Sequence, residues 1–120
     1  MAGASTIMNV LAINDGVNPF GTALAGGADA QATANELQSS ANSLVPATTN
    51  VAYRLPVAGF GVPITVYNNA ASALAGKVYP PLGGTIYASG AAGVLNAGVS
   101  VAQFVAMTFV SLGNGSYIAK

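Results

Sequence analysis

Residues 50–120 show short apolar runs that alternate with polar positions and end at glycine, proline or asparagine. The run 51–55 alternates and stops at Pro56, and the run 62–67 stops at Asn68-Asn69. A period of two is typical of strands, and turn signals every 8–12 residues or so fit a sandwich or barrel. Further runs of the same form cover 73–79, 85–87, 94–95, 99–112 and 116–118. We therefore predict a mainly β fold, a small antiparallel β-sandwich or barrel-like domain over residues 50–120.

The longest run, 99–112, places apolar side chains on both faces of the single strand that it predicts. Apolar faces of a sheet are stable when they are covered. In one small sheet, two such faces indicate contact with another subunit. Beyond this run, Asn114-Gly115 predicts the turn of a β-hairpin.

Residues 29–45 show a helical period instead. Asp29 follows two glycines and can cap a first helical turn, while Pro46 disfavours helix at the residue before it. We predict one short α-helix over 29–45, which must dock on another surface because an isolated helix of this length is marginal in water. Its apolar stripe, at spacings of four, three, four and three, is Ala30, Ala34, Leu37, Ala41 and Leu44.

Residues 1–28 combine apolar positions with closely spaced turn signals at Asn14-Asp15-Gly16 and Asn18-Pro19-Phe20-Gly21. This pattern predicts an extended N-terminal arm that packs on a neighbouring copy or on another protein, within a single-domain protein. An edge strand of the same domain would explain the pattern equally well. The candidate contact residues of the arm are Ile7, Met8, Val10, Leu11, Ile13 and Phe20.

Charge is scarce along the whole chain. Charged residues make up 5% of it, three of each sign, whereas an ordinary globular domain is about a quarter charged. A free-standing monomer normally keeps a mixed charged surface and a net charge away from zero. Much of the outer surface is therefore expected to be buried against copies of this chain or a partner. Three scattered cations also argue against nucleic acid as that partner.

Membrane insertion and export are not expected either. A spanning helix needs about 20 mostly apolar residues, and the best candidate, 99–112, is interrupted by polar residues and rich in β-branched ones. Residues 1–10 contain no lysine or arginine, so the positive region of a secretory signal is missing. There is no cysteine for a disulfide or a thiolate site. We expect a protein made and assembled inside a cell.

The chain offers little for catalysis. It has no histidine and no cysteine, and its three carboxylates, Asp15, Asp29 and Glu36, all precede the β-rich part. We therefore predict a protein that is not an enzyme, with no catalytic residue, no cofactor and no metal site. Arg54 stands apart, since an arginine in an alternating strand either lies on a solvated face or pairs with a carboxylate across an interface.

Six short motifs, in a fixed order, resemble a recurrent type of small virion protein of tailed bacteriophages. The resemblance covers half to two-thirds of the chain and does not extend to the arm. Its motifs are turn and core residues, which specify a fold better than a role. They are Ala-Gln-Ala-Thr-Ala-Asn-Glu-Leu (30–37), Tyr-Arg-Leu-Pro (53–56), Gly-Val-Pro-Ile-Thr-Val-Tyr-Asn-Asn (61–69), Val-Tyr-Pro-Pro-Leu-Gly-Gly-Thr-Ile (78–86), Leu-Asn-Ala-Gly-Val-Ser-Val-Ala-Gln-Phe-Val (95–105) and Gly-Asn-Gly-Ser-Tyr (113–117).

Proteins of this type include head decoration, or cement, proteins that sit on the capsid shell, commonly as trimers. The resemblance thus implies a homotrimer that binds the major capsid protein on the head surface of a virion assembled in the bacterial cytoplasm. One alternative is a tail, fibre or baseplate subunit, with exposed aromatic loops at Tyr79-Pro80-Pro81 or at Tyr87. Another is a carbohydrate-binding β-sandwich, in which tyrosine would replace the usual tryptophan as the stacking platform.

Overall fold

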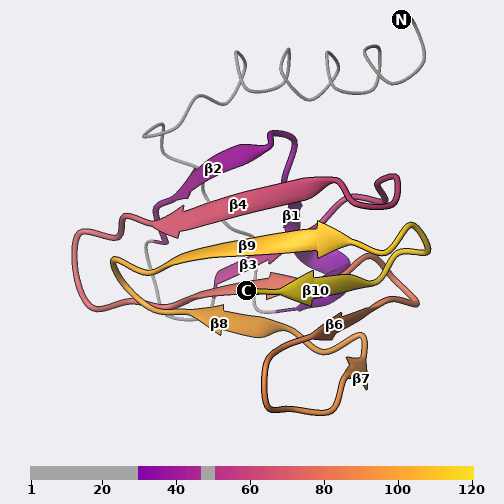
Figure 1. The fold of residues 1–120 in the computed structure, drawn as a ribbon. Coiled ribbons are helices and arrows are strands. Elements are labelled where there is room, and N and C mark those ends of the chain that lie inside the picture. The colour runs from indigo at the N-terminus through magenta and orange to yellow at the C-terminus, as the bar shows by residue number, and fades with distance from the viewer. Residues whose placement is uncertain (1–29, 47–50) are drawn as a thin grey trace, which may run out of the picture.

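Two β-sheets form the framework of residues 30–46 and 51–120, which are the residues that the computed structural model describes (Figure 1). The prediction of a mainly β protein is therefore confirmed. The smaller sheet has the order β1 (Asn35–Glu36), β3 (Val51–Arg54), β5 (Gly76–Tyr79) and β8 (Val99–Val101). The larger sheet has the order β2 (Ala41–Leu44), β4 (Pro63–Asn68), β9 (Ala106–Ser111), β10 (Tyr117–Ala119), β6 (Thr85–Tyr87) and β7 (Val94–Leu95).

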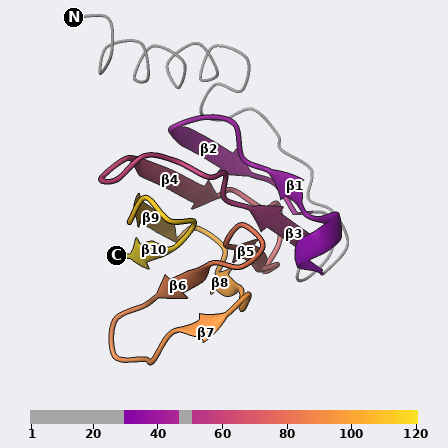
Figure 2. The same cartoon turned by 90° about the vertical axis from the view of Figure 1, so that its right-hand side faces the viewer.

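Both sheets are mixed, so the expectation of an antiparallel architecture is wrong for much of the pairing. Strands β1, β3 and β5 run parallel to one another in the smaller sheet, and β2 runs parallel to β4 in the larger one. The reason is that the chain changes sheet after each of its first five strands (Figure 2). In these three pairs one strand of the other sheet comes between the two partners and reverses the chain direction, whereas a direct hairpin would make the partners antiparallel.

The helix predicted over 29–45 does not form in the part of it that the structure describes. One 3₁₀ turn, η1 (Gln31–Thr33), is followed by β1 and β2. The backbone pairs with strands instead, since the Leu37 amide donates to the Arg54 carbonyl and the Thr65 amide to the Ser40 carbonyl, both at 2.8 Å. Leu37 and Leu44 of the predicted stripe are nevertheless buried, because each enters the core from one of the two sheets.

The run 99–112 is two strands in different sheets, and not the single strand that its apolar pattern suggests. Between β8 and β9 the chain crosses from the smaller to the larger sheet, with Phe104 in a left-handed conformation (φ 62°). The Phe104 amide donates to the Asn68 carbonyl at 2.7 Å, which fixes this crossing. Because of this break, β8 and β9 each bury one face in their own sheet. The apolar pattern of the run therefore does not need a single strand covered on both faces, nor the subunit contact inferred from such a strand.

The hairpin predicted at Asn114-Gly115 is confirmed. Strands β9 and β10 pair antiparallel on either side of it, with Tyr117 opposite Ser111. Gly113 and Gly115 both adopt positive φ angles, 85° and 86°, which glycine accepts at little cost. The Leu112 amide donates to the Ser116 carbonyl at 2.9 Å and closes the loop.

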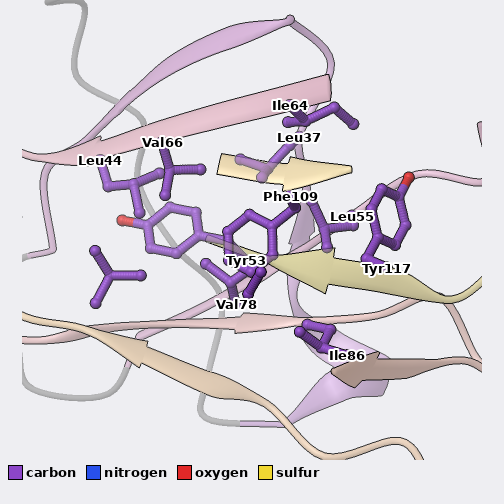
Figure 3. Close-up of a cluster of buried hydrophobic side chains, with 12 residues drawn as sticks. Leu37, Leu44, Tyr53, Leu55, Ile64, Val66, Val78, Ile86, Phe109 and Tyr117 are labelled. Carbon is purple, nitrogen blue, oxygen red and sulfur yellow. The ribbon is translucent and has the colours of Figure 1, made fainter. Parts of the chain in front are cut away.

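One hydrophobic core receives side chains from both sheets (Figure 3). Tyr53, Val78 and Val101 come from the smaller sheet and are fully buried. The larger sheet supplies Leu44, Ile64, Val66, Phe109, Tyr117 and Ile86. Within residues 30–46 and 51–120 no helix has the length and hydropathy needed to cross a bilayer.

Candidate assembly surfaces

The outer face of the smaller sheet carries most of the charge of the described residues. Tyr53 and Val78 point into the core, so the alternating residues of β3 and β5 point outward. The register places Glu36, Arg54 and Tyr79 in one row across β1, β3 and β5. Lys77 lies on the same face, with its Nζ 5.5 Å from the centre of the Tyr79 ring, within cation–π range. This face therefore combines charged side chains with a small buried apolar cluster of Ala34, Ala52 and Tyr79.

Arg54 is the candidate contact residue that the structure describes. Its side chain is half-buried, and its Nη1 donates to the carbonyl of Gln31 at 3.2 Å. Part of the guanidinium is thus engaged within the chain, where it ties η1 to β3. Pairing of Arg54 with a carboxylate across an interface stays a prediction. The remaining candidates lie outside the described residues: Ile7, Met8, Val10, Leu11, Ile13 and Phe20.

Gln31 and Asn96 form a polar junction that the sequence pattern did not indicate. The Gln31 Nε2 donates to the Pro80 carbonyl at 2.8 Å and to the Asn96 Oδ1 at 3.1 Å. The same Oδ1 accepts from the Gly83 amide at 2.7 Å. Asn96 has a left-handed backbone (φ 61°), which asparagine tolerates better than most residues. The junction fastens loop 80–84 to two segments distant in the sequence.

The outer face of the larger sheet differs in character. Pro63, Val110, Ile118 and Tyr87 are register partners, so they form an apolar row across β4, β9, β10 and β6. Ile118 is 41% exposed and Tyr87 45% exposed. In the next row the hydroxyls of Thr65 and Thr108 are 3.0 Å apart and hydrogen-bonded, and the backbone of Lys120 pairs with that of Thr108. This face is apolar and hydroxyl-rich, with the charge of Lys120 beside Thr108.

Three loops meet at one end of the two sheets, on the right in Figure 1: 55–62, 80–84 and 112–116. No charged residue occurs in any of them. Three large apolar side chains stand out from the loops, namely Val57, Phe60 and Leu82, which are 73%, 81% and 70% exposed. The sequence pattern does not mark these three side chains as exposed, although the glycines on either side of Phe60 and after Leu82 indicate loop positions.

Metal-binding chemistry is not apparent in the described ranges. No three His, Cys, Asp or Glu side chains of residues 30–46 and 51–120 could together hold a metal ion. The prediction that the chain is not an enzyme continues to rest on its residue inventory.

No protein-family model, no curated protein and no solved structure matches this chain.

Proposed function

We propose that this chain is a capsid decoration protein of a tailed bacteriophage, which binds the assembled head shell at capsomer junctions and stabilises it. The observation that carries the proposal is an outer surface rich in large apolar side chains and poor in charge. Each exposed apolar group is better covered than hydrated, and contiguous apolar patches on soluble proteins mark interaction sites.

The described surface provides many such groups. Nine large hydrophobic side chains of the described ranges are exposed: Val57, Phe60, Leu82, Tyr87, Val94, Leu95, Phe104, Val105 and Ile118. The same ranges contain four charged residues, so few charged side chains would lose their hydration on assembly. The order of motifs between residues 30 and 117, which resembles small phage virion proteins, supports a virion as the assembly.

The stabilising effect follows from linkage. A subunit that binds the assembled lattice, and not the free capsid protein, shifts the equilibrium toward the lattice. As a homotrimer of two-layer β-sandwich subunits, each with its arm over residues 1–28, it would engage several capsid sites at once, and weak contacts would add. The partners in this proposal are other copies of the chain and the major capsid protein, and the location is the head surface.

Co-sedimentation with expanded, empty shells made of the major capsid protein tests the proposal. We expect the chain to sediment with such shells, to saturate at a fixed ratio to the capsid protein, and to raise the temperature at which the shells fall apart. A chain that stays in the supernatant at micromolar concentration, with unchanged shell stability, would refute the role.

A tail, fibre or baseplate subunit is the second candidate, and the 45% exposure of Tyr87 favours it. The other aromatic loop expected for that role is absent from the surface, because Tyr79 is 8% exposed and Pro80 and Pro81 are buried. Copy number in purified virions separates the two roles. Hundreds of copies per particle indicate decoration, and tens or fewer indicate a tail component.

A further inference from the structure

Loops 55–62, 80–84 and 112–116 form a surface that we name the loop platform. The hairpin loop 112–116 lies between the other two. An ideal Cβ on Gly113 would lie 3.2 Å from the Cβ of Phe60, and one on Gly84 would lie 2.0 Å from the carbonyl oxygen of Gly115. The hairpin loop is thus in direct contact with each of the other two loops, although all three are separated by many residues in the sequence (Figure 1).

Hydrogen bonds fix the first of these loops to the hairpin. The Ser111 Oγ donates to the Ala58 carbonyl at 2.9 Å and accepts from the Gly113 amide at 3.0 Å. The Gly61 amide donates to the Ser111 carbonyl at 2.7 Å. The Tyr117 hydroxyl donates to the Pro56 carbonyl from inside the core.

The second loop is fixed in the same way. The Thr85 amide donates to the Ser116 Oγ at 3.1 Å, and the Gly84 amide donates to the Pro81 carbonyl at 2.9 Å. The Gln31–Asn96 junction holds the Pro80 carbonyl and the Gly83 amide from the other side. The platform is therefore preorganised. Its tips, which are the exposed side chains of Val57, Phe60 and Leu82, would lose little conformational entropy when a partner buries them.

The chemistry of the tips restricts what that partner is. Val57, Phe60 and Leu82 present apolar groups without a charged residue in any of the loops, so a charge on the partner would be buried without compensation. A lipid surface is disfavoured because no lysine or arginine is present in the loops to attract anionic headgroups. Convex apolar tips are matched by a recess lined with apolar, uncharged side chains.

The area of the tips restricts the mode of binding. Phe60 can bury about 150–250 Å² and the aliphatic Val57 and Leu82 less, so the three tips supply roughly half or less of the ~800 Å² that each partner buries in a stable pairwise interface. One platform on a second copy would therefore be a weak pairing. The same area is sufficient where a lattice offers the recess repeatedly and a trimer engages several recesses together.

We propose, on the basis of the decoration role above, that the loop platform is the shell-facing surface, and that Val57, Phe60 and Leu82 insert into an apolar, uncharged recess that the major capsid protein presents in repeated copies. This assignment places the contact on the β domain, on side chains that the structure describes.

A pair of matched triple variants tests the assignment. V57S/F60S/L82S removes the tips, and V94S/L95S/F104S removes one valine, one phenylalanine and one leucine elsewhere, with similar exposures of 62%, 63% and 63%. Binding to empty expanded shells is measured by co-sedimentation. We expect the platform triple to bind about 100-fold more weakly and the control triple to stay within about 3-fold of wild type. F60S alone serves as a milder variant, and circular dichroism verifies folding.

Each other outcome counts against the assignment. If wild type binds shells and the platform triple binds equally well, the platform is not the contact although the decoration role stands. If wild type does not bind, both proposals fall. Loss of self-association in the platform triple, measured by light scattering, would assign the tips to a second copy. Loss of binding to phosphatidylcholine vesicles would assign them to lipid.

Discussion

At the scale of single residues, the buried asparagine at the end of β4 is a strong structural determinant. Asn68 is fully buried, its Nδ2 donates to the carbonyls of Leu74 and Val101, both at 2.8 Å, and its Oδ1 accepts from the Ala70 amide at 3.0 Å. One side chain thus satisfies three backbone groups of two segments. Buried polar groups left without partners are costly, so this amide is difficult to replace.

We expect Asn68→Asp to lower the free energy of unfolding by about 3 kcal/mol, because a carboxylate would face two carbonyl oxygens in the core. Asn69→Asp is the control, since Asn69 is exposed. Urea denaturation at pH 7 measures both variants. Equal stability of the two would show that the Asn68 amide is not the determinant.

Ser43 presents the opposite situation. Its hydroxyl is buried and, among the described residues, has no hydrogen-bond partner. Removing an unpaired buried polar group relieves its desolvation cost. We expect Ser43→Ala to leave stability unchanged or raise it by up to about 1 kcal/mol, whereas the exposed Ser100→Ala should be neutral. A clear loss in thermal melting of Ser43→Ala would reveal a partner outside the described ranges.

Two core tyrosines make stability depend on alkaline pH. Burial raises the pKa of Tyr53 and the pKa of Tyr117 to about 12, from an ordinary value of 10.0. Below pH 10 both phenols are neutral in the folded and unfolded states, so their contribution is complete there. Between pH 10 and about 12 the unfolded chain releases these protons first, so the free energy of unfolding falls as the pH rises.

The corresponding test compares wild type with Y53F/Y117F by urea denaturation at pH 8 and at about pH 11. We expect the loss of stability between the two pH values to be smaller in the variant, whatever its stability at pH 8. The same loss in both proteins would mean that other groups cause the alkaline destabilisation.

At the scale of elements, the contact between loop 80–84 and the β9–β10 hairpin depends on glycine. A Cβ on Gly84 would meet the Gly115 carbonyl oxygen at 2.0 Å, and neither backbone can move aside as a flexible side chain would. We expect Gly84→Ala to cost about 3 kcal/mol of folding stability. Gly59→Ala is the control, because its nearest neighbour is 4.0 Å away. A difference below about 0.5 kcal/mol would refute the close contact.

Several elements could be predicted from sequence because local chemistry defines them. Residues 63–68 and 85–87 alternate in burial, the run 51–55 stops at Pro56, and the hairpin at Asn114-Gly115 depends on a turn that glycine favours. Strand order could not be predicted in this way. The strand order depends on the repeated change of the chain from one sheet to the other. The sequence of a short run between two turns does not indicate which sheet its strand joins.

The false helix over 29–45 shows where periodicity fails. Its alanines and leucines fit a helical stripe, but Ser39 and Asn42 bond to each other locally, with the Asn42 Nδ2 donating to the Ser39 carbonyl at 2.8 Å. Serine and asparagine side chains that bond to nearby backbone groups compete with the hydrogen bonds of a helix. The backbone pairs instead with the edges of β3 and β4. The crossing at 102–105 was missed because no glycine or proline marks it.

The candidate contact surface was only partly predictable. Scarcity of charge predicts a surface that is covered in an assembly but not which residues lie there, and Val57, Phe60 and Leu82 are residue types that usually lie in a core. Their exposure is a property of the assembled loops, which come together through contacts between distant segments. Arg54 was singled out by its position in an alternating strand, and its bond to Gln31 became visible with the tertiary structure.

At the scale of the whole molecule, the apolar outer surface predicts self-association. We expect light scattering to give the mass of a trimer across a hundredfold dilution, because a monomer with this surface would leave apolar area uncovered. A stable monomer at all concentrations would contradict the trimer and the argument from buried surface. The measurement needs only the purified chain.

The scarcity of charge also predicts how shell binding responds to salt. Salt screens interactions between charges and leaves apolar contacts largely unaffected. We expect the affinity for shells to change less than about 3-fold between roughly 50 mM and 500 mM NaCl. A steep decrease with salt would show that Arg54, Lys77 or another charged group carries the contact.

The position of the β9–β10 hairpin in the larger sheet has a consequence for synthesis. The hairpin lies between β4 and β6, which are made before it, so these strands have no bridge between them until residues 106–119 have left the ribosome. Folding of the larger sheet therefore waits for its last two strands, and it requires the slow pairing of segments far apart in the chain. Until then the nascent chain exposes unpaired strand edges, the condition in which aggregation competes with folding.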